Sequence, residues 1–251
     1  MILAEPPPSQ GDLHFRLFGF PVRIHPFFWV VAVLLSIRGD SPPEKVLSWV
    51  VALLVSILIH ELGHALLQRR YGGSPRIVLH GMGGLAICSD CDRSSRSQIL
   101  ISLAGPVAGF VFAAVVLVLI NLMGYRAGIS LSRPDITGYA MPLLGMSFYW
   151  EAFESMSVNE MVGNLLRINV LWGAVNLLPI YPLDGGQISR ELCQQRSPRE
   201  GIVLSLQISM IAAIAMAIVG LSWGELYIVV LFGYLAYSSY KTLEAYRGSA
   251  W

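Results

Sequence analysis

The sequence is poor in charged residues. Only 13% of its 251 residues are Asp, Glu, Lys or Arg, and 55% are hydrophobic, whereas a soluble globular domain carries about 25% charged residues. This composition excludes a disordered chain and argues against a water-soluble protein. Lys and Arg number 17 against 16 Asp and Glu, so the basic surplus of a nucleic-acid-binding protein is missing and no nucleic-acid partner is expected.

Cysteine is scarce as well. Cys88, Cys91 and Cys193 are too few for a disulfide framework, so we expect the fold to be held by other means. Cys88 and Cys91 have CxxC spacing, but no second pair completes a metal site and no βαβ pattern surrounds them. The spacing alone therefore predicts neither a metal site nor a redox site.

Internal repeats and polar linkers are also missing, so we expect one domain over residues 1–251. Crossing the ~30 Å hydrocarbon core of a bilayer takes about 20 helical residues, and apolar runs of roughly this length recur along the chain. The predicted fold class is an all-α membrane protein with six transmembrane helices and a small membrane-associated β-hairpin. The predicted spans lie at about residues 24–37, 46–67, 99–123, 161–181, 202–222 and 226–240.

Lys and Arg are distributed unevenly between these spans. With six spans, both termini and the loops at residues 68–98 and 182–201 share one side, which carries twelve Lys and Arg against four on the other side. Positively charged short loops stay in the cytoplasm. We therefore expect an integral, multi-pass protein of the cell membrane, the inner membrane in a bacterium, with cytoplasmic N- and C-termini.

The second predicted span contains three ionisable residues, which are costly at membrane depth and indicate function. His60, Glu61 and His64 form the motif HExxH. Residues four apart share one face of a helix, so both imidazoles could bind one metal ion while Glu61 faces its water. Zinc suits two imidazoles and an oxygen ligand, with the fourth position left to water. The alternative is a pair of buried core histidines bonded to the backbone or to each other.

A third ligand is available at the end of the fourth span, in residues 176–186 (NLLPIYPLDGG). Spans two and four run in the same direction in the six-span topology, so we expect Asp184 to reach the metal on the Arg-rich side. Pro179 and Pro182 cannot continue a helix, and irregular backbone at membrane depth is tolerated only where it is buried or lines a wet cavity. Considered without the HExxH motif, this segment is also consistent with the end of a helix followed by a turn in which Asp184 is exposed to solvent.

The two motifs, HELGH at residues 60–64 and NLLPIYPLDGG at 176–186, resemble the site-2 protease family of intramembrane zinc metalloproteases. Residues 19–27 resemble the family's entry segment, and the small residues of AGPVAG at 104–109 resemble its third-span motif. From the residues alone, AGPVAG is expected to pack closely against the catalytic spans.

The resemblance implies one Zn²⁺ ion bound by His60, His64 and Asp184, with Glu61 as the general base. It also implies that Asn176 lies near the substrate carbonyl, a role that the residues alone do not suggest.

The resemblance is to a minimal form of the family. Members with a PDZ domain carry it as a large insertion, which the 39 residues at 122–160 are too few to hold, and no pair of CBS domains follows the last span. We expect a bare catalytic core whose regulator is a separate protein or the substrate itself.

An apolar, Gly-rich segment at residues 76–87 is too short to span a bilayer. We predict a membrane-dipping β-hairpin there, whose edge pairs with an extended strand of the substrate. Pairing of this kind would help because a helical substrate must unwind before its carbonyl can be attacked. An ordinary cytoplasmic hairpin is the alternative.

These observations predict an intramembrane zinc endopeptidase that cleaves a transmembrane segment of a membrane-bound substrate near the cytoplasmic side, in regulated intramembrane proteolysis. Its expected partners are the lipid bilayer, a substrate with a transmembrane helix and a separate regulatory protein. Two alternatives stay open. A metal transporter or sensor would use the same ligands but not need Glu61, and a scaffold with a degenerate site would bind no zinc.

Overall fold

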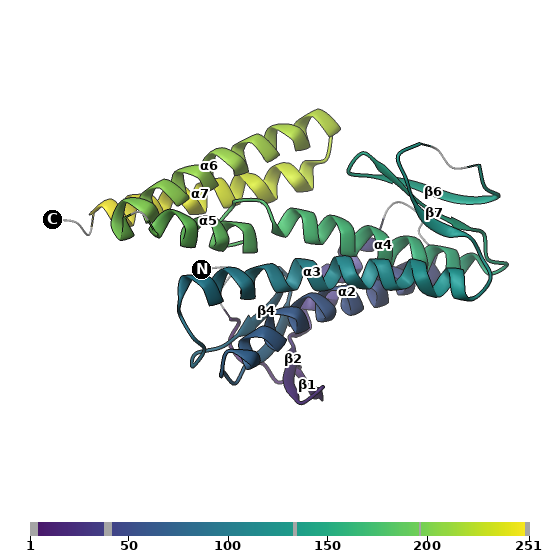
Figure 1. Cartoon of the computed structure of the whole chain (residues 1–251), viewed down its shortest axis with the longest axis horizontal. Helices are drawn as coiled ribbons and strands as arrows, with labels where there is room; N and C mark the ends of the chain where they lie inside the picture. The colour runs from purple at the N-terminus through teal and green to yellow at the C-terminus, as the bar shows by residue number, and fades with distance from the viewer. Residues whose placement is uncertain (1–4, 38–41, 133–134, 196, 249–251) are drawn as a thin grey trace. The chain divides into compact units, whose positions relative to one another are not determined.

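The computed structural model describes residues 5–37, 42–132, 135–195 and 197–248 (Figure 1). Three arginines of the charge count, Arg38, Arg133 and Arg196, lie outside these ranges. The chain forms two compact units: Met1–Cys91 with Ala104–Ala174, and Asp92–Leu103 with Val175–Trp251.

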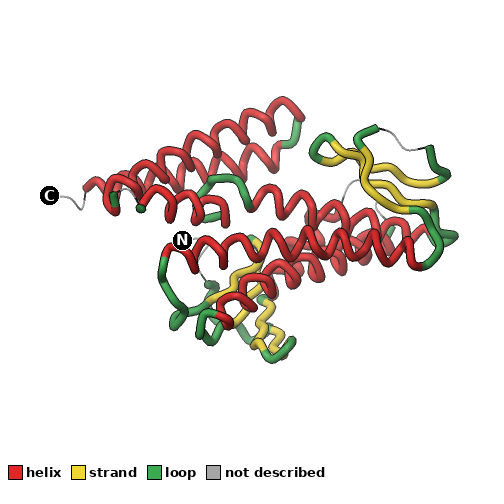
Figure 2. Tube along the Cα trace, viewed as in Figure 1, coloured by secondary structure: helices red, strands yellow, loops and turns green. Residues whose placement is uncertain are grey.

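Helices make up most of the described chain (Figure 2). Their bounds are α1 Pro26–Ser36, α2 Pro43–Arg70, α3 Ser95–Leu122, α4 Met156–Asn176, α5 Asp184–Gln194, α6 Pro198–Trp223 and α7 Leu226–Gly248.

Three of these helices, α2, α3 and α6, are long and apolar enough to cross a membrane. Helix α1 has 11 residues and a length of about 16 Å at 1.5 Å per residue, so it is too short to cross a bilayer alone. Helices α4 and α7 have 21 and 23 residues, but among the described residues only the other three combine this length with the required hydropathy. The expected count of six transmembrane helices is therefore not confirmed.

A four-stranded sheet in the first unit contains the predicted hairpin. Strands β3 (Arg76–His80) and β4 (Gly83–Ile87) pair antiparallel, which confirms the hairpin at residues 76–87. A second hairpin, β1 (Leu13–Leu17) and β2 (Phe20–Ile24), joins it through a parallel β2–β3 pair, so the strand order is β1-β2-β3-β4. The sheet packs against α1 and α2 through a core that includes Val22, Ile24, Ile77, Leu79, Phe28, Ile57 and Leu62.

A second sheet in the same unit lies at the opposite end of its helices (Figure 1). It consists of β5 (Ala127–Ser130), β6 (Gly138–Leu143) and β7 (Met146–Glu151), all antiparallel in the order β5-β7-β6. Phe148 and Trp150 of β7 are buried in a cluster with residues of α3 and α4. The expectation of a single hairpin in an all-α protein was wrong on this point, because two sheets accompany the helices.

The second unit contains α5, α6 and α7, and α6 packs along α7. Helix α6 ends at Gly224, whose φ of 71° is a left-handed conformation that glycine adopts without steric cost. The chain then turns directly into α7, so the two helices form a hairpin. Helix α5 differs from the expectation, because the segment after residue 181, expected to be a loop, is helical from Asp184 to Gln194.

Candidate metal centre

Helix α2 carries the HExxH motif in its C-terminal half. The helix begins at Pro43, whose fixed φ suits a first helical turn, and ends with Arg69 and Arg70, whose charges complement the helix dipole. His60, Glu61 and His64 are only 4%, 4% and 7% exposed. Three ionisable side chains are thus buried on adjacent turns of a helix that is apolar enough to cross a membrane.

The two imidazoles face each other. Nε2 of His60 and Nε2 of His64 are 3.2 Å apart, and the ring centroids are 4.9 Å apart. Two nitrogens bound to one tetrahedral zinc at about 2.05 Å would be about 3.3 Å apart. The donor pair therefore fits zinc. Without metal, the same separation suits an N–H···N hydrogen bond between the rings, the alternative raised from the sequence.

Helix α3 closes one side of this histidine pair through a glycine. A Cβ on Gly105 would collide with the His64 ring and lie 2.8 Å from Nε2 of His60. Gly63, the residue before His64, is also close to α3, because a Cβ on it would collide with the Ala104 carbonyl and lie 2.8 Å from Ala108 Cβ. These contacts confirm that the small residues of AGPVAG pack against α2, the helix that carries the HExxH motif.

Strand β4 covers Glu61. The Gly84 backbone approaches the Glu61 side chain so closely that a Cβ on Gly84 would lie 2.6 Å from Glu61 Cδ. The neighbouring Gly83 lies against Trp172 of α4, whose Cζ2 atom is 3.1 Å from the position of a Cβ. The hairpin thus places an edge strand beside the expected general base.

Helices α2 and α4 are joined by two side-chain hydrogen bonds, one buried and one partly buried. The Asn169 amide donates to Ser56 Oγ at 2.8 Å, and the Asn164 amide donates to Ser48 Oγ at 3.3 Å. Ser56 comes after Ser48 in α2, and its partner Asn169 comes after Asn164 in α4. The two helices therefore run in the same direction, as the predicted topology requires. Ser56 is one turn before His60, so the Asn169 bond lies next to the motif.

The remaining expected site residues belong to the second unit. Asn176 is the last residue of α4 and is 8% exposed, and Asp184 is the first residue of α5 and is 9% exposed. An acidic residue in the first turn of a helix is favoured by the helix dipole. Asp184 and the two histidines come from different units, so its assignment as the third ligand stays a prediction.

The bend before α5 is held by hydrogen bonds inside the second unit. Tyr181 N–H donates to Ser209 Oγ of α6 at 2.7 Å, and Ser209 is hydrogen-bonded at 2.8 Å to Ser239 of α7. Leu183 N–H donates to the Ile180 carbonyl at 2.7 Å. The irregular backbone around Pro182 therefore has partners for its polar groups, as burial requires.

Several residues around the motif were not found from the sequence. Asn169 could have been identified from the sequence, because a polar residue inside a predicted apolar span usually has a role in function or packing. Gly84 and Trp172 gave none, since their importance comes only from what the fold places beside them.

A family model for Peptidase family M50 matches residues 48–219, more than half of the chain and a range that contains both motifs. Among solved structures, "Site-2 Protease from Methanocaldococcus jannaschii" matches with a TM-score of 0.58 and 22% identity, covering 92% of this chain and 95% of that chain. This match shows a shared fold.

Curated relatives are similar in sequence. A zinc metalloprotease of Methanocaldococcus jannaschii is 28% identical over 84% of this chain and 53% of that protein. Putative zinc metalloprotease Rip3 of Mycobacterium tuberculosis is 28% identical over 81% and 49%, and stage IV sporulation protein FB of Bacillus subtilis is 26% identical over 74% and 54%. The chain spans about half the length of the curated relatives it matches. The relatives' names and the histidine geometry agree on zinc as the metal.

Proposed function

Because this chain belongs to Peptidase family M50, we propose that it is an intramembrane zinc endopeptidase. It cleaves a transmembrane segment of a membrane-bound substrate near the cytoplasmic side, in regulated intramembrane proteolysis. The observation that carries the proposal is the buried His60–His64 pair, with nitrogens 3.2 Å apart and Glu61 on the same helix. That helix is long and apolar enough to cross a membrane.

In this proposal His60, His64 and Asp184 hold the zinc ion. The parallel course of α2 and α4 supports the third ligand, because the chain continues from α4 into the segment that carries Asp184. Zinc bound there would supply a Lewis acid that makes water nucleophilic near neutral pH. Glu61 accepts a proton from the attacking water and returns it to the leaving nitrogen.

Asn176 is assigned a positioning role toward the substrate. Its amide N–H groups can donate to the carbonyl oxygen of the scissile peptide, where negative charge develops during attack. Its burial at the end of α4 supports the assignment, because donors in a water-excluded site stabilise that charge more strongly.

The outer edge of β4 binds the substrate in extended form. Strand β4 is the edge strand of its sheet and lies directly beside Glu61. An unwound substrate segment added to this edge would gain main-chain hydrogen bonds in place of those lost from its helix. The remaining partners are the lipid bilayer and a separate regulatory protein.

The first test measures zinc content and cleavage for the wild type and for Glu61→Gln in detergent. Glu61→Gln should keep its zinc and lose cleavage of a transmembrane substrate by about 10²–10⁴-fold, the range that a general base contributes. Glu44→Gln, on an exposed turn of the same helix, is the matched control and should cleave normally. A fully active Glu61→Gln would favour the metal transporter or sensor.

The second test removes the proposed third ligand. Asp184→Ala should lose both zinc and cleavage, because two imidazoles alone bind zinc weakly. Glu225→Gln, an exposed acid of the same unit, is the control and should retain both. Normal zinc content in Asp184→Ala would remove Asp184 from the ligand set.

A further inference from the structure

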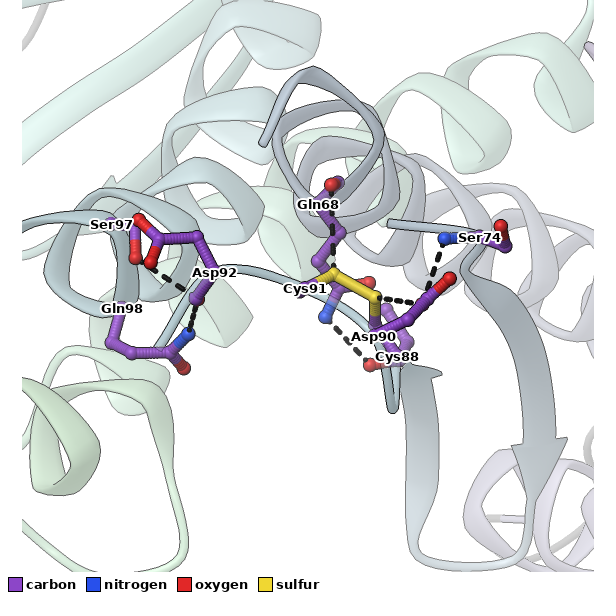
Figure 3. Close-up of a disulfide and its surroundings, with 9 residues drawn as sticks. Gln68, Ser74, Cys88, Asp90, Cys91, Asp92, Ser97 and Gln98 are labelled. Carbon is purple, nitrogen blue, oxygen red and sulfur yellow. Dashed lines mark hydrogen bonds between the residues drawn. A yellow bond between two sulfur atoms is a disulfide. The ribbon is translucent and has the colours of Figure 1, made fainter. Parts of the chain in front are cut away.

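Cys88 and Cys91 form a disulfide directly after strand β4 (Figure 3). Cys88 follows Ile87, the last residue of β4, and the Gly84 backbone of the same strand lies against Glu61. The CxxC spacing by itself predicts no function for this pair. In the structure it sits at the end of the strand that covers the proposed general base.

The loop that carries the disulfide is attached to the C-terminal end of α2. The Gln68 side chain donates to the Ala86 carbonyl of β4 at 3.0 Å, and Ser74 N–H donates to Asp90 Oδ1 at 3.0 Å. Gly73 packs against both sulfur atoms, with no room for a Cβ. The CxxC loop therefore connects β4 to the end of the helix that carries the HExxH motif.

The same geometry suits the reduced form. Cys88 Sγ lies 3.2 Å from Asp90 Oδ1, and Cys91 Sγ lies 3.5 Å from the Gln68 carbonyl oxygen, so each thiol has an acceptor for its S–H (Figure 3). Both cysteines are half-buried, so a small reductant can reach them. CxxC pairs are also the motif in which thiol reactivity is commonly raised.

We propose that Cys88 and Cys91 form a thiol–disulfide exchange site that determines how firmly β4 is held beside Glu61. The effect on cleavage rests on the proposed function, whereas the exchange chemistry does not. In the oxidised form the loop is anchored and β4 is ordered as a template for substrate. In the reduced form the loop is released, and β4 holds the substrate less well.

The exchange reaction balances with an external dithiol as the reductant. A thiolate of the dithiol attacks Cys88 Sγ, the S–S bond breaks, and Cys91 leaves as a thiolate that takes up a proton. The ionised Asp90 disfavours a thiolate at Cys88, which makes Cys91 the better leaving group. The second thiol of the reductant then releases Cys88. Two electrons and two protons pass to the cysteines, and the reductant becomes a disulfide.

The first experiment titrates the pair in the full chain. Cys193→Ser protein in detergent is equilibrated with mixtures of oxidised and reduced dithiothreitol, and free thiols are counted by the mass added by maleimide. We expect two thiols to appear together in a single transition. A pair that stays reduced, or stays oxidised, across the whole series would overturn the proposal, whether or not the protein cleaves a substrate.

The second experiment measures hydrogen exchange of β4 and cleavage with and without the reductant. Reduced wild type and Cys88→Ser/Cys91→Ser should both exchange the amides of residues 83–87 faster than oxidised wild type. Both should also show a several-fold lower kcat/KM, expressed mainly in KM. A reductant effect of equal size in Cys88→Ser/Cys91→Ser, or unchanged exchange in fully reduced wild type, would overturn the proposal. Altered exchange in a protein that cleaves nothing would instead count against the proposed function alone.

Discussion

Glycines bring the backbone of neighbouring elements into contact with the metal-binding helix. Gly105 lets α3 close against His60 and His64, and Gly84 lets β4 close against Glu61. Any larger residue at either position would push its side chain into a group that the proposed chemistry needs. The geometry of the centre thus depends on residues that carry no functional group.

Replacing Gly105 with alanine should displace the histidines. The added methyl group meets the His64 ring and Nε2 of His60, so we expect Gly105→Ala to lose zinc affinity and at least about ten-fold of the cleavage rate, as metal-site distortions typically do. Zinc content and cleavage are the measurements.

Gly233→Ala is the matched control, because a Cβ there meets nothing within 4 Å and alanine suits a helix better than glycine. It should keep full zinc and activity. Normal zinc binding by Gly105→Ala would show that the α3 backbone does not limit the position of the histidines.

Asp12 gives a pH-dependent contribution to stability. Burial raises the pKa of this carboxyl, but hydrogen bonds from Ser9 and Arg23 outweigh that effect and hold the pKa at about 2. The unfolded value is about 3.9, so the contribution is fully present above about pH 4 and is lost as the pH falls toward 2.

We therefore expect Asp12→Asn to unfold at a lower temperature than wild type at pH 6, with the difference shrinking between pH 4 and pH 2. Thermal unfolding in detergent over this pH range is the measurement. A difference that does not change with pH would mean that the charge of Asp12 does not contribute.

At the scale of elements, polar pairs set how α2 lies against α4. The bond from Asn169 to Ser56 is buried and lies one turn from His60. Hydrogen bonds between helices in membranes contribute about 0.6 kcal/mol on average and about 1.7 kcal/mol at most. This bond is therefore expected to matter more for the position of α2 than for total stability.

A double-mutant cycle tests this expectation. Ser56→Ala and Asn169→Ala should each lower stability, with a coupling energy of about 0.6 kcal/mol and a larger proportional loss of cleavage. Ser222→Ala removes an exposed hydroxyl bonded within its own helix and serves as the control. A coupling energy of zero would show that the bond does not link the helices.

Two hairpin turns show what local sequence can specify. The Phe18–Gly19 and Leu144–Gly145 turns both have positive φ at both residues, which two-residue hairpins require. Alternating buried residues, Met141 with Leu143 and Phe148 with Trp150, flank the second turn. The sequence does not show this alternation in β7, because Tyr149 between Phe148 and Trp150 is also aromatic.

At the scale of the whole molecule, the orientation in the membrane is open to a direct test. The charge distribution predicts that residues 122–160 lie outside the cell and the C-terminus inside. In a cysteine-free background, Leu131→Cys should react with an impermeant maleimide in intact cells, and Glu244→Cys only after permeabilisation. Both positions are exposed, so access to the reagent does not limit labelling. Labelling of both from outside would contradict the three spans that are predicted between the two positions.

The sequence alone identified the family and the metal, and it predicted the ligand residues on α2. These follow from local facts: HExxH spacing on a helix, ionisable groups in an apolar run, and a Gly-rich segment too short to span. Membership of a zinc metalloprotease family and the hairpin at residues 76–87 are confirmed. The six transmembrane helices are not confirmed, because the length of an apolar run in the sequence does not distinguish a membrane span from a shorter helix such as α1.

Tertiary structure decided which groups surround the motif. Gly105 against the histidines, Gly84 against Glu61 and the disulfide beside Gly73 each join segments at least fifteen residues apart. No periodicity within either segment encodes such a contact, because it arises only when two elements pack and leave room for a hydrogen atom and nothing larger.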